Sequence, residues 1–431
     1  MKNDTFCIMP FIHQNLKHEG RVCACWRGQT LLGNSNTSTL AEIFNNDETK
    51  KLRQELLSGI KSEGCRSCWD LEASGVKSTR QDTLYPWHIE NNELKYNSGN
   101  IDPVPGQLEN YIRSTVKEDF SYPIEQLKSV EIRFDNTCNL MCRHCSPVYS
   151  SLWSKAVARS TELADLMKGP GDVNIKPSQR LNADIIDEIE TLAPHLQEIL
   201  ITGGEPLYHE KHYEFLQKLE PYAENIVLNY NSNFSTLEYK GNNILPLWKK
   251  FKNVGVLVSI DATPDIYPYI RVQGDINKVE SNIKLAQDTL NNIELQATCT
   301  TSVLNMTRIV DVFKYFMQLN VRVHASLVQY PAALNPRILP KEVKVKITEE
   351  YNHFINNLDT IVKDYTNNKW WIKYYQRRIP VVGKKLIDYM NAKDLYESDW
   401  DKFKNYMQVQ DKYNKTYILD FYPEFAEYWN E

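Results

Sequence analysis

Three cysteines stand close together in the segment 136–145. Cys138, Cys142 and Cys145 are separated by three and two residues, so one short loop carries three thiols. Cysteine thiolates are the usual ligands of iron–sulfur clusters, and three of them can hold three irons of a four-iron cluster. The fourth iron then has no protein ligand and stays open to a small molecule. The spacing therefore predicts an iron–sulfur site that does chemistry.

Two other uses of this loop stay open on spacing alone. A structural zinc site takes four nitrogen or sulfur ligands. His144 could be the fourth, but it lies between the second and third cysteines and is poorly placed to complete a tetrahedron. A disulfide framework needs an oxidising compartment, and nothing in the sequence indicates one.

A second group of cysteines lies near the N-terminus. The pair Cys65-x2-Cys68 and two upstream cysteines supply four thiolates, which suit either an all-thiolate zinc site or a fully ligated four-iron cluster. Spacing alone does not choose between these metals. Cys299 stands alone in an apolar and threonine-rich run and is expected to be a small core residue. The members of the N-terminal group are Cys7, Cys23, Cys25, Cys65 and Cys68.

Strand-like and helical segments alternate from residue 128 to about 330. This alternation predicts an α/β fold with βα units around a parallel sheet, here a partial (β/α)6 TIM-like barrel. Functional residues of such barrels collect at the C-terminal ends of the strands. The expected strands are 129–135, 197–202, 225–231, 254–260, 294–302 and 321–328. The expected helices are 149–167, 183–193, 209–220, 244–252, 277–291 and 306–319.

Residues able to bind a ligand follow several expected strands. Gly203 and Gly204 let the backbone approach a ligand closely, and Glu205 presents a carboxylate that can accept from an ammonium group. Asp261 can hold ribose hydroxyls, and the guanidinium of Arg271 can grip a carboxylate with two parallel hydrogen bonds. Taken singly, a tight turn, a helix N-cap and a surface arginine explain these residues as well.

Together these motifs resemble the radical S-adenosylmethionine (SAM) superfamily over roughly 128–330. In that family the three cysteines hold a [4Fe–4S] cluster whose open iron binds the amino and carboxylate groups of SAM. The resemblance implies a reductive cleavage of SAM to a 5′-deoxyadenosyl radical, which abstracts hydrogen from a substrate. It places Gly203, Gly204 and Glu205 at the methionine ammonium, Asn233, Ser259 and Asp261 near the ribose and sulfonium, Arg271 near the carboxylate, and His144 near the adenine.

The N-terminal pattern is similar to the SPASM/twitch module. The matching features are Cys7-x2-Pro10-Phe11, Gly20-x-Val22-x-x-Cys25, Gly33-Asn34, Ile43-Phe44-Asn45 and Cys65-x2-Cys68. The resemblance implies an auxiliary [4Fe–4S] cluster held by Cys7, Cys25, Cys65 and Cys68, with Cys23 as an alternative to Cys25. In most of that family the module follows the catalytic core, whereas here it precedes it.

Composition sets the remaining expectations. The chain has 431 residues and a net charge of -5, so a nucleic-acid partner is not expected. The N-terminus lacks a signal-peptide pattern and no stretch is long enough to span a membrane, so a cytoplasmic protein is expected. The expected domains are an auxiliary-cluster domain (1–95), a linker (96–127), a radical SAM partial barrel (128–330) and a helical extension (331–431).

Three further expectations concern surfaces and helices. Arg80 and the charges near it are expected to form a solvated face. The aromatic residues Trp370, Trp371, Tyr374 and Tyr375 are expected to belong mainly to the core. Helices are expected at 38–58, and in the extension near 341–366, 369–377, 383–393 and 398–410.

The expected partners are SAM, a one-electron reductase such as a flavodoxin or ferredoxin, and a substrate. The resemblance implies a ribosomally made peptide as substrate. The alternative is the same radical chemistry on a small molecule, by a dehydrogenase, epimerase or mutase. A hypothesis of another class is a zinc-bound interaction protein without catalysis.

Overall fold

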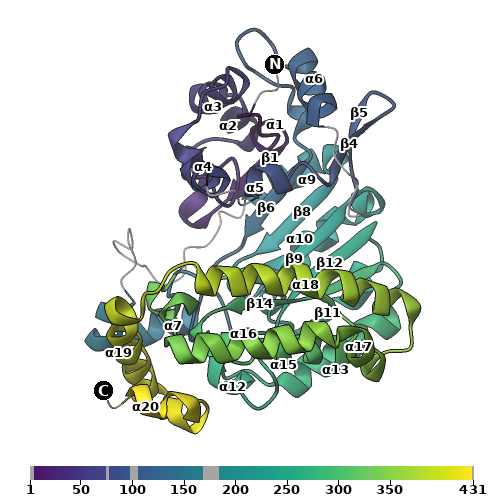
Figure 1. Cartoon of the computed structure of the whole chain (residues 1–431). Coiled ribbons are helices and arrows are strands. Elements are labelled where there is room, and N and C mark those ends of the chain that lie inside the picture. The colour runs from purple at the N-terminus through teal and green to yellow at the C-terminus, as the bar shows by residue number, and fades with distance from the viewer. Residues whose placement is uncertain (1–3, 74–76, 98–104, 168–183, 329, 430–431) are drawn as a thin grey trace. The chain divides into compact units, whose positions relative to one another are not determined.

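The computed structural model describes residues 4–73, 77–97, 105–167, 184–328 and 330–429 (Figure 1). The chain divides into two compact units. The first unit comprises Met1–Asp135, Gln179–Tyr230 and Pro246–Val254, and the second comprises Asn136–Ser178, Asn231–Leu245 and Gly255–Glu431. Both units are therefore discontinuous in sequence, and the four-part domain division stays a prediction.

A sheet forms the centre of the first unit. Its strands β6 (Ser129–Arg133), β8 (Glu198–Thr202) and β9 (Val227–Ser232) are parallel, with Val130 opposite Ile199 and Ile199 opposite Leu228. Strand β1 (His13–Leu16) adds to β6 in parallel, and β2 (Arg21–Cys23) and β3 (Leu31–Asn34) extend the sheet beyond β1 in antiparallel pairs. The N-terminal cysteine region is thus continuous with the strand that precedes the C-x3-C-x2-C loop.

The helices of the first unit differ from the expectations in two places. The expected helix 38–58 is two helices, α2 (Leu40–Phe44) and α3 (Asp47–Leu57), because Thr39 and Asn46 each cap a new helix. The expected linker 96–127 contains the helix α6 (Pro105–Thr115), which the sequence did not predict; burial of Leu108 and Ile112 stabilises this helix. Other elements of this unit include α1 (Met9–Ile12), α4 (Arg66–Ala73), α5 (Thr79–Asp82), β4 (Trp87–Glu90), β5 (Glu93–Tyr96), α9 (Asp184–Leu192) and α10 (Glu210–Leu219).

The second unit also contains parallel strands and covering helices. Strands β14 (Ile293–Thr301) and β15 (Arg322–Leu327) pair in parallel, and β12 (Asn253–Ser259) neighbours β14. Every second residue of β12 and β14 is buried, as expected for strands with one covered face. This mixed architecture confirms the predicted α/β class. Its helices include α7 (Ser151–Val157), α8 (Thr161–Leu166), α12 (Tyr267–Ile270), α13 (Ile276–Thr289), α14 (Val303–Met306) and α15 (Ile309–Gln318).

The C-terminal part of the second unit is helical, as predicted. Helices α16 (Lys341–Asn356) and α18 (Lys369–Asn391) lie alongside each other in Figure 1. The sequence predicted two helices where α18 runs without a break through Pro380, because burial of Ile379 and Leu386 outweighs the cost of an interior proline. The other helices here are α17 (Leu358–Tyr365), α19 (Tyr396–Asn414) and α20 (Ala426–Trp429).

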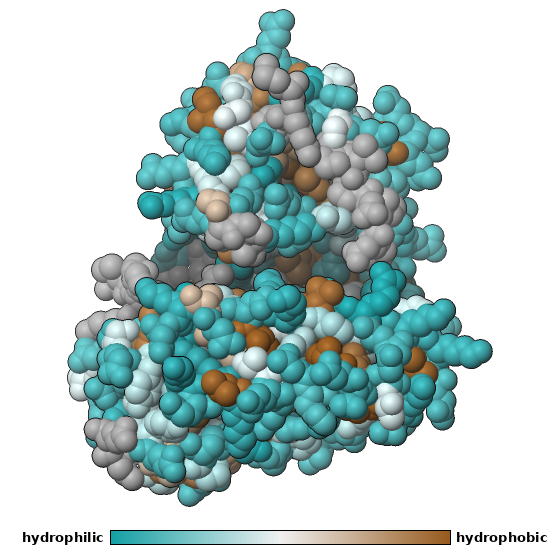
Figure 2. All heavy atoms as spheres, viewed as in Figure 1, coloured by the Kyte–Doolittle hydropathy of each residue, from teal (hydrophilic) through white to brown (hydrophobic). Residues whose placement is uncertain are grey.

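Aromatic residues of α18 cover β15, which lies at one edge of the sheet. The backbone N–H of Val323 donates to the Tyr374 hydroxyl (2.9 Å), and the Tyr375 hydroxyl donates to the Val321 carbonyl (2.9 Å). Tyr375 is fully buried, whereas Trp370 is half exposed, so the aromatic segment is only partly core. Figure 2 shows hydrophobic residues scattered over a mostly hydrophilic surface on this face. Within the described ranges, no helix has both the length and the apolar character of a membrane span.

Candidate functional site

Four of the five N-terminal cysteines line one small cavity in the first unit. Cys7 precedes α1, Cys25 follows β2, Cys65 directly precedes α4, and Cys68 lies in the first turn of α4. The Gly28 backbone N–H donates to Cys25 Sγ (3.1 Å). Cys23 is buried on β2 and is not among the residues that line this cavity. The structure therefore brings together the four sulfurs that the SPASM resemblance selected.

A glycine allows the loop after Cys25 to lie against the turn that carries Cys65. The Gln29 backbone N–H donates to the Gly64 carbonyl (3.0 Å). A Cβ at Gly64 would lie 1.7 Å from Thr30 Oγ1. Any larger residue at position 64 would therefore push the Cys25 loop away from Cys65.

Burial keeps three of these thiols protonated when no metal is bound. Burial raises the pKa of Cys25 to about 11 and that of Cys65 to about 12, and it raises the pKa of Cys7 well above its usual value. The neighbouring thiols raise the pKa of Cys7 and Cys65 further. The thiols of Cys7, Cys25 and Cys65 are consequently protonated at neutral pH, and a bound metal must displace their protons.

Arg80 also lines the cavity, which corrects the expectation of a solvated face. Its side chain is buried because Nε and Nη2 bind both carboxylate oxygens of Glu72 (3.0 and 2.6 Å) and Nη1 binds the Phe6 carbonyl (2.7 Å). The sequence carries only a weak signal for this role. Ser78 and Gln81 form a capping box that places Arg80 on the short helix α5, but nothing local predicts its distant partners.

The C-x3-C-x2-C loop lies in the second unit. Cys142 belongs to the short strand β7 (Met141–Cys142), which pairs with β13 (Arg271–Val272). The Cys145 backbone N–H donates to the Cys142 carbonyl (2.9 Å), and the Cys138 backbone N–H donates to Ser151 Oγ (3.3 Å). Burial, followed by the nearby Cys142 thiol, raises the pKa of Cys145 to about 12.

A buried polar network adjoins this loop. Arg271 Nη1 lies 3.6 Å from Cys142 Sγ, and Arg271 Nη2 lies 2.7 Å from Asp261 Oδ2. His144 Nε2 lies 3.4 Å from the same oxygen of Asp261, and burial lowers the pKa of His144. Three of the residues assigned to SAM by resemblance therefore contact one another here. Arg271 is engaged by Asp261 and by the sulfur of Cys142, and its assignment to the carboxylate of SAM stays a prediction.

The remaining predicted residues lie in both units. In the second unit, Asn233 Nδ2 donates to Asn139 Oδ1 (2.9 Å), and Ser259 is the half-buried last residue of β12. In the first unit, Gly203 has φ +138° and Glu205 accepts from the Leu207 backbone N–H (3.1 Å). The positive φ makes glycine the preferred residue at position 203.

The sequence did not single out Arg143, which anchors the loop. It lies between the second and third loop cysteines and is fully buried against Asp411 of α19 (2.7 Å) and over the Tyr269 ring (3.9 Å). The sequence shows that this arginine lies inside the cysteine motif. It does not show its partner, because Asp411 lies far along the chain.

The described residues contain no group of three or more His, Cys, Asp or Glu side chains already arranged to hold a metal ion. The donor chemistry nevertheless fits iron–sulfur clusters, because four thiols share one cavity and three share one loop.

Two sequence families match the chain. Residues 132–311 match the radical SAM superfamily, and residues 7–69 match SPASM, an iron–sulfur cluster-binding domain. The chain therefore carries a radical SAM domain preceded by a SPASM domain, which confirms the predicted family and order. The same matches confirm iron–sulfur clusters and SAM as the cofactors. No curated protein sequence matches the chain.

Solved structures offer more distant likenesses. Streptococcus suis SuiB bound to the precursor peptide SuiA shares 13% identity, with a TM-score of 0.36, over 72% of this chain and 64% of that chain. The protein anSMEcpe with bound AdoMet shares 16% identity, also with a TM-score of 0.36, over 56% of this chain and 68% of that chain. The alignment spans less than two thirds of SuiB.

Proposed function

We propose that the chain is a radical SAM enzyme that cleaves SAM reductively and abstracts hydrogen from a peptide substrate. The observation that carries this proposal is the C-x3-C-x2-C loop after β6, inside the region that matches the radical SAM superfamily. Three thiolates on that loop leave one iron of a four-iron cluster open. When bound, the cluster supplies the electron that breaks the sulfonium–carbon bond of SAM.

The chain's own residues hold and orient the cofactors. Cys138, Cys142 and Cys145 are the proposed ligands of the catalytic cluster, and Arg271 steadies Cys142 by contact with its sulfur. The SAM contacts proposed from the family resemblance are Gly203, Gly204, Glu205, Asn233, Ser259, Asp261, Arg271 and His144. No residue is assigned to the substrate itself.

Cys7, Cys25, Cys65 and Cys68 are the proposed ligands of an auxiliary cluster. Four thiols around one cavity support full ligation, which leaves no open iron for a substrate. We therefore propose electron transfer or structural support as the role of this cluster. A one-electron reductase such as a flavodoxin or ferredoxin would supply electrons in the cytoplasm.

Substitution of the loop cysteines tests the proposed activity. The triple variant Cys138→Ala/Cys142→Ala/Cys145→Ala should lose the iron and sulfide of one cluster and lose all SAM cleavage under reductant. The variant Cys25→Ala should lose auxiliary iron, whereas Cys23→Ala is the matched control and should keep it. Metal and sulfide analysis of anaerobically purified protein, with chromatography of the SAM products, measures these outcomes. Retained cleavage in the triple variant would refute the proposal.

The peptide substrate rests on the SPASM resemblance of residues 7–69. Incubation with peptides encoded nearby, followed by mass spectrometry for loss of hydrogen or uptake of deuterium, tests it. Turnover of small molecules but of no peptide would favour the alternative substrate class. Zinc at both cysteine sets, with no affinity for SAM, would instead support a non-catalytic interaction protein.

A further inference from the structure

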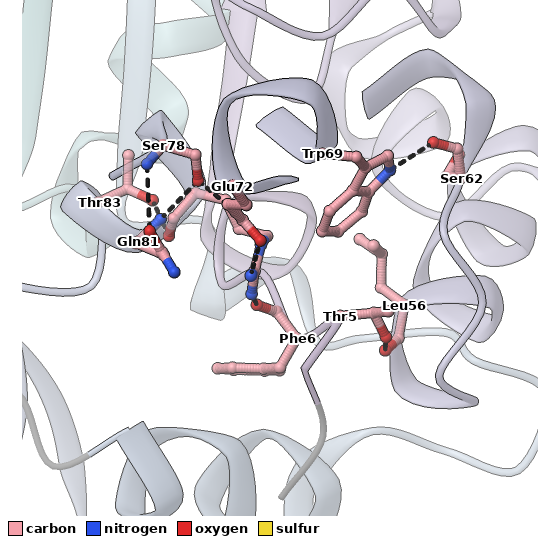
Figure 3. Close-up of polar contacts among 10 residues, drawn as sticks. Thr5, Phe6, Leu56, Ser62, Trp69, Glu72, Ser78, Gln81 and Thr83 are labelled. Atoms are coloured by element: carbon pink, nitrogen blue, oxygen red, sulfur yellow. Dashed lines mark hydrogen bonds and ion pairs between the residues drawn. The ribbon is translucent and has the colours of Figure 1, made fainter. Parts of the chain in front are cut away.

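Arg80 is a buried cation on the wall of the four-cysteine cavity. It makes two hydrogen bonds to the Glu72 carboxylate and one to the Phe6 carbonyl. Ser78 Oγ, which caps α5, also donates to Glu72. Figure 3 shows the surrounding polar contacts, with Glu72, Ser78 and Gln81 on one side and Trp69 and Ser62 on the other. A bidentate arginine–carboxylate pair in a buried place has a fixed geometry.

These contacts join the segments that carry the cysteines. Phe6 directly precedes Cys7, and Glu72 lies one helical turn after Cys68 on α4. The Arg80 guanidinium also lies over the ring of Trp69 (5.0 Å), whose Nε1 donates to the Ser62 carbonyl (2.9 Å) ahead of Cys65. Thr5 Oγ1 donates to the Leu56 carbonyl (2.8 Å) and fixes the N-terminal segment at a second point. Arg80 thus connects the Cys7 segment with the Cys65 and Cys68 segment.

The charge of Arg80 matters as much as its contacts. A four-iron cluster held by four thiolates is an anion, and one added electron makes it more negative. A cation beside the cluster stabilises the reduced form more than the oxidised form, so it raises the reduction potential. The effect is strong where burial excludes water, because the local dielectric constant is low. Glu72 carries the opposite charge and acts in the opposite direction.

We propose that Arg80 is a positioning residue of the auxiliary cluster, which clamps the Cys7 and Cys68 segments together and raises the reduction potential of the cluster. Glu72 holds Arg80 in place and offsets part of its charge. This inference rests on the proposed auxiliary cluster and adds to it a determinant of the cluster's potential.

The test uses the full chain with only the auxiliary cluster present. In the Cys138→Ala/Cys142→Ala/Cys145→Ala background, a dithionite titration followed by electron paramagnetic resonance gives the one-electron midpoint potential. The compared substitutions are Arg80→Gln, Arg80→Lys and Glu72→Gln. Arg66→Gln is the matched control, because Arg66 lies on the same helix as Glu72 but its side chain is 79% exposed and its charge is screened by water and salt.

The expected shifts differ in sign. Arg80→Gln should move the potential to more negative values, Glu72→Gln should move it to more positive values, and Arg80→Lys should lie between Arg80→Gln and the background protein. Arg66→Gln should leave it unchanged. A merely structural role would not produce opposite shifts. If the Arg80→Gln variant does not load iron, the direction of the shift in midpoint potential for Glu72→Gln still tests the inference.

Two results would overturn the inference, and they are distinguishable. Iron-loaded variants with unchanged potentials, or with shifts of the same sign for Arg80→Gln and Glu72→Gln, would refute the role of Arg80 alone. A background protein without iron would refute the auxiliary cluster, and with it the role of Arg80.

Discussion

Asp261 is fully buried, and its charge is balanced by one arginine. Its Oδ2 lies 2.7 Å from Arg271, and its Oδ1 accepts from the Thr300 backbone N–H (2.7 Å). Such a pair need not be more stable than an apolar replacement of both residues, because desolvation of the two charges is costly. Removal of one partner is different, since the other charge then stays buried without compensation. The pair therefore fixes the position of Arg271 beside Cys142.

The variant Asp261→Asn tests this argument. It should lower the free energy of unfolding by about 3–5 kcal/mol, because Arg271 would be left buried without its counter-charge. Urea unfolding of the purified protein measures the change. The control is Asp288→Asn, which breaks the exposed Lys284–Asp288 pair of α13 and should cost less than about 1 kcal/mol. Equal losses in the two variants would contradict the argument.

At the scale of elements, the packing of α16 against α18 depends on one small residue. A Cβ at Gly383 of α18 would lie 2.3 Å from Cε2 of Tyr351 on α16. The ring of Tyr351 is buried, and its hydroxyl donates to the Pro380 carbonyl (3.1 Å), so the ring is held in place. Gly383 therefore allows a close approach that no other residue permits.

Gly383→Ala should destabilise the protein by about 1–3 kcal/mol, the usual cost of overpacking. The clash should outweigh the gain of up to about 1 kcal/mol that alanine brings to a helix interior. The control is Gly106→Ala in α6, where an added Cβ would meet nothing within 4 Å, so no loss is expected. Thermal unfolding monitored by circular dichroism compares the two. A Gly383→Ala variant that is more stable than the unsubstituted protein would contradict this prediction, because α16 and α18 would then have moved apart without loss of stability.

At the scale of the whole molecule, stability should depend on pH through two buried histidines. His13 on β1 and His212 on α10 each make one hydrogen bond, to Ser129 Oγ (2.7 Å) and to the Tyr230 hydroxyl (2.9 Å). Their other ring nitrogens are buried without a partner. Burial lowers the pKa of each to about 3, from an ordinary value of 6.5. Both are therefore neutral in the folded protein.

The unfolded chain binds more protons than the folded protein between pH 6.5 and about 3. The contribution of each histidine to the free energy of unfolding is thus complete above pH 6.5 and decreases as the pH falls. At pH 5 the loss is about 2 kcal/mol per histidine. The variant His212→Gln should reduce the difference in stability between pH 7 and pH 5, measured by urea unfolding, by about this amount. His353→Gln, at an exposed position on α16, should leave the difference unchanged.

Much of the secondary structure could be predicted from the sequence because its signals are local. The strands β6, β8, β9, β12, β14 and β15 lie at the expected places, since apolar residues there follow the period of a strand. The sheet extension by β1, β2 and β3 was not predicted. It depends on the pairing of His13 with Ser129, and no local pattern specifies a partner so far along the chain.

The sequence by itself determined the chemistry of this protein. The spacing of Cys138, Cys142 and Cys145, and the pair Cys65 and Cys68, placed the thiols within a few residues of one another, which the covalent chain guarantees. Only the tertiary structure decided which distant groups adjoin them. It buried Arg80 against Glu72, paired Asp261 with Arg271, and placed Cys25 on the cavity wall while Cys23 stayed on β2. Burial and charge pairing depend on segments far apart in sequence, so they become visible only when the chain is folded.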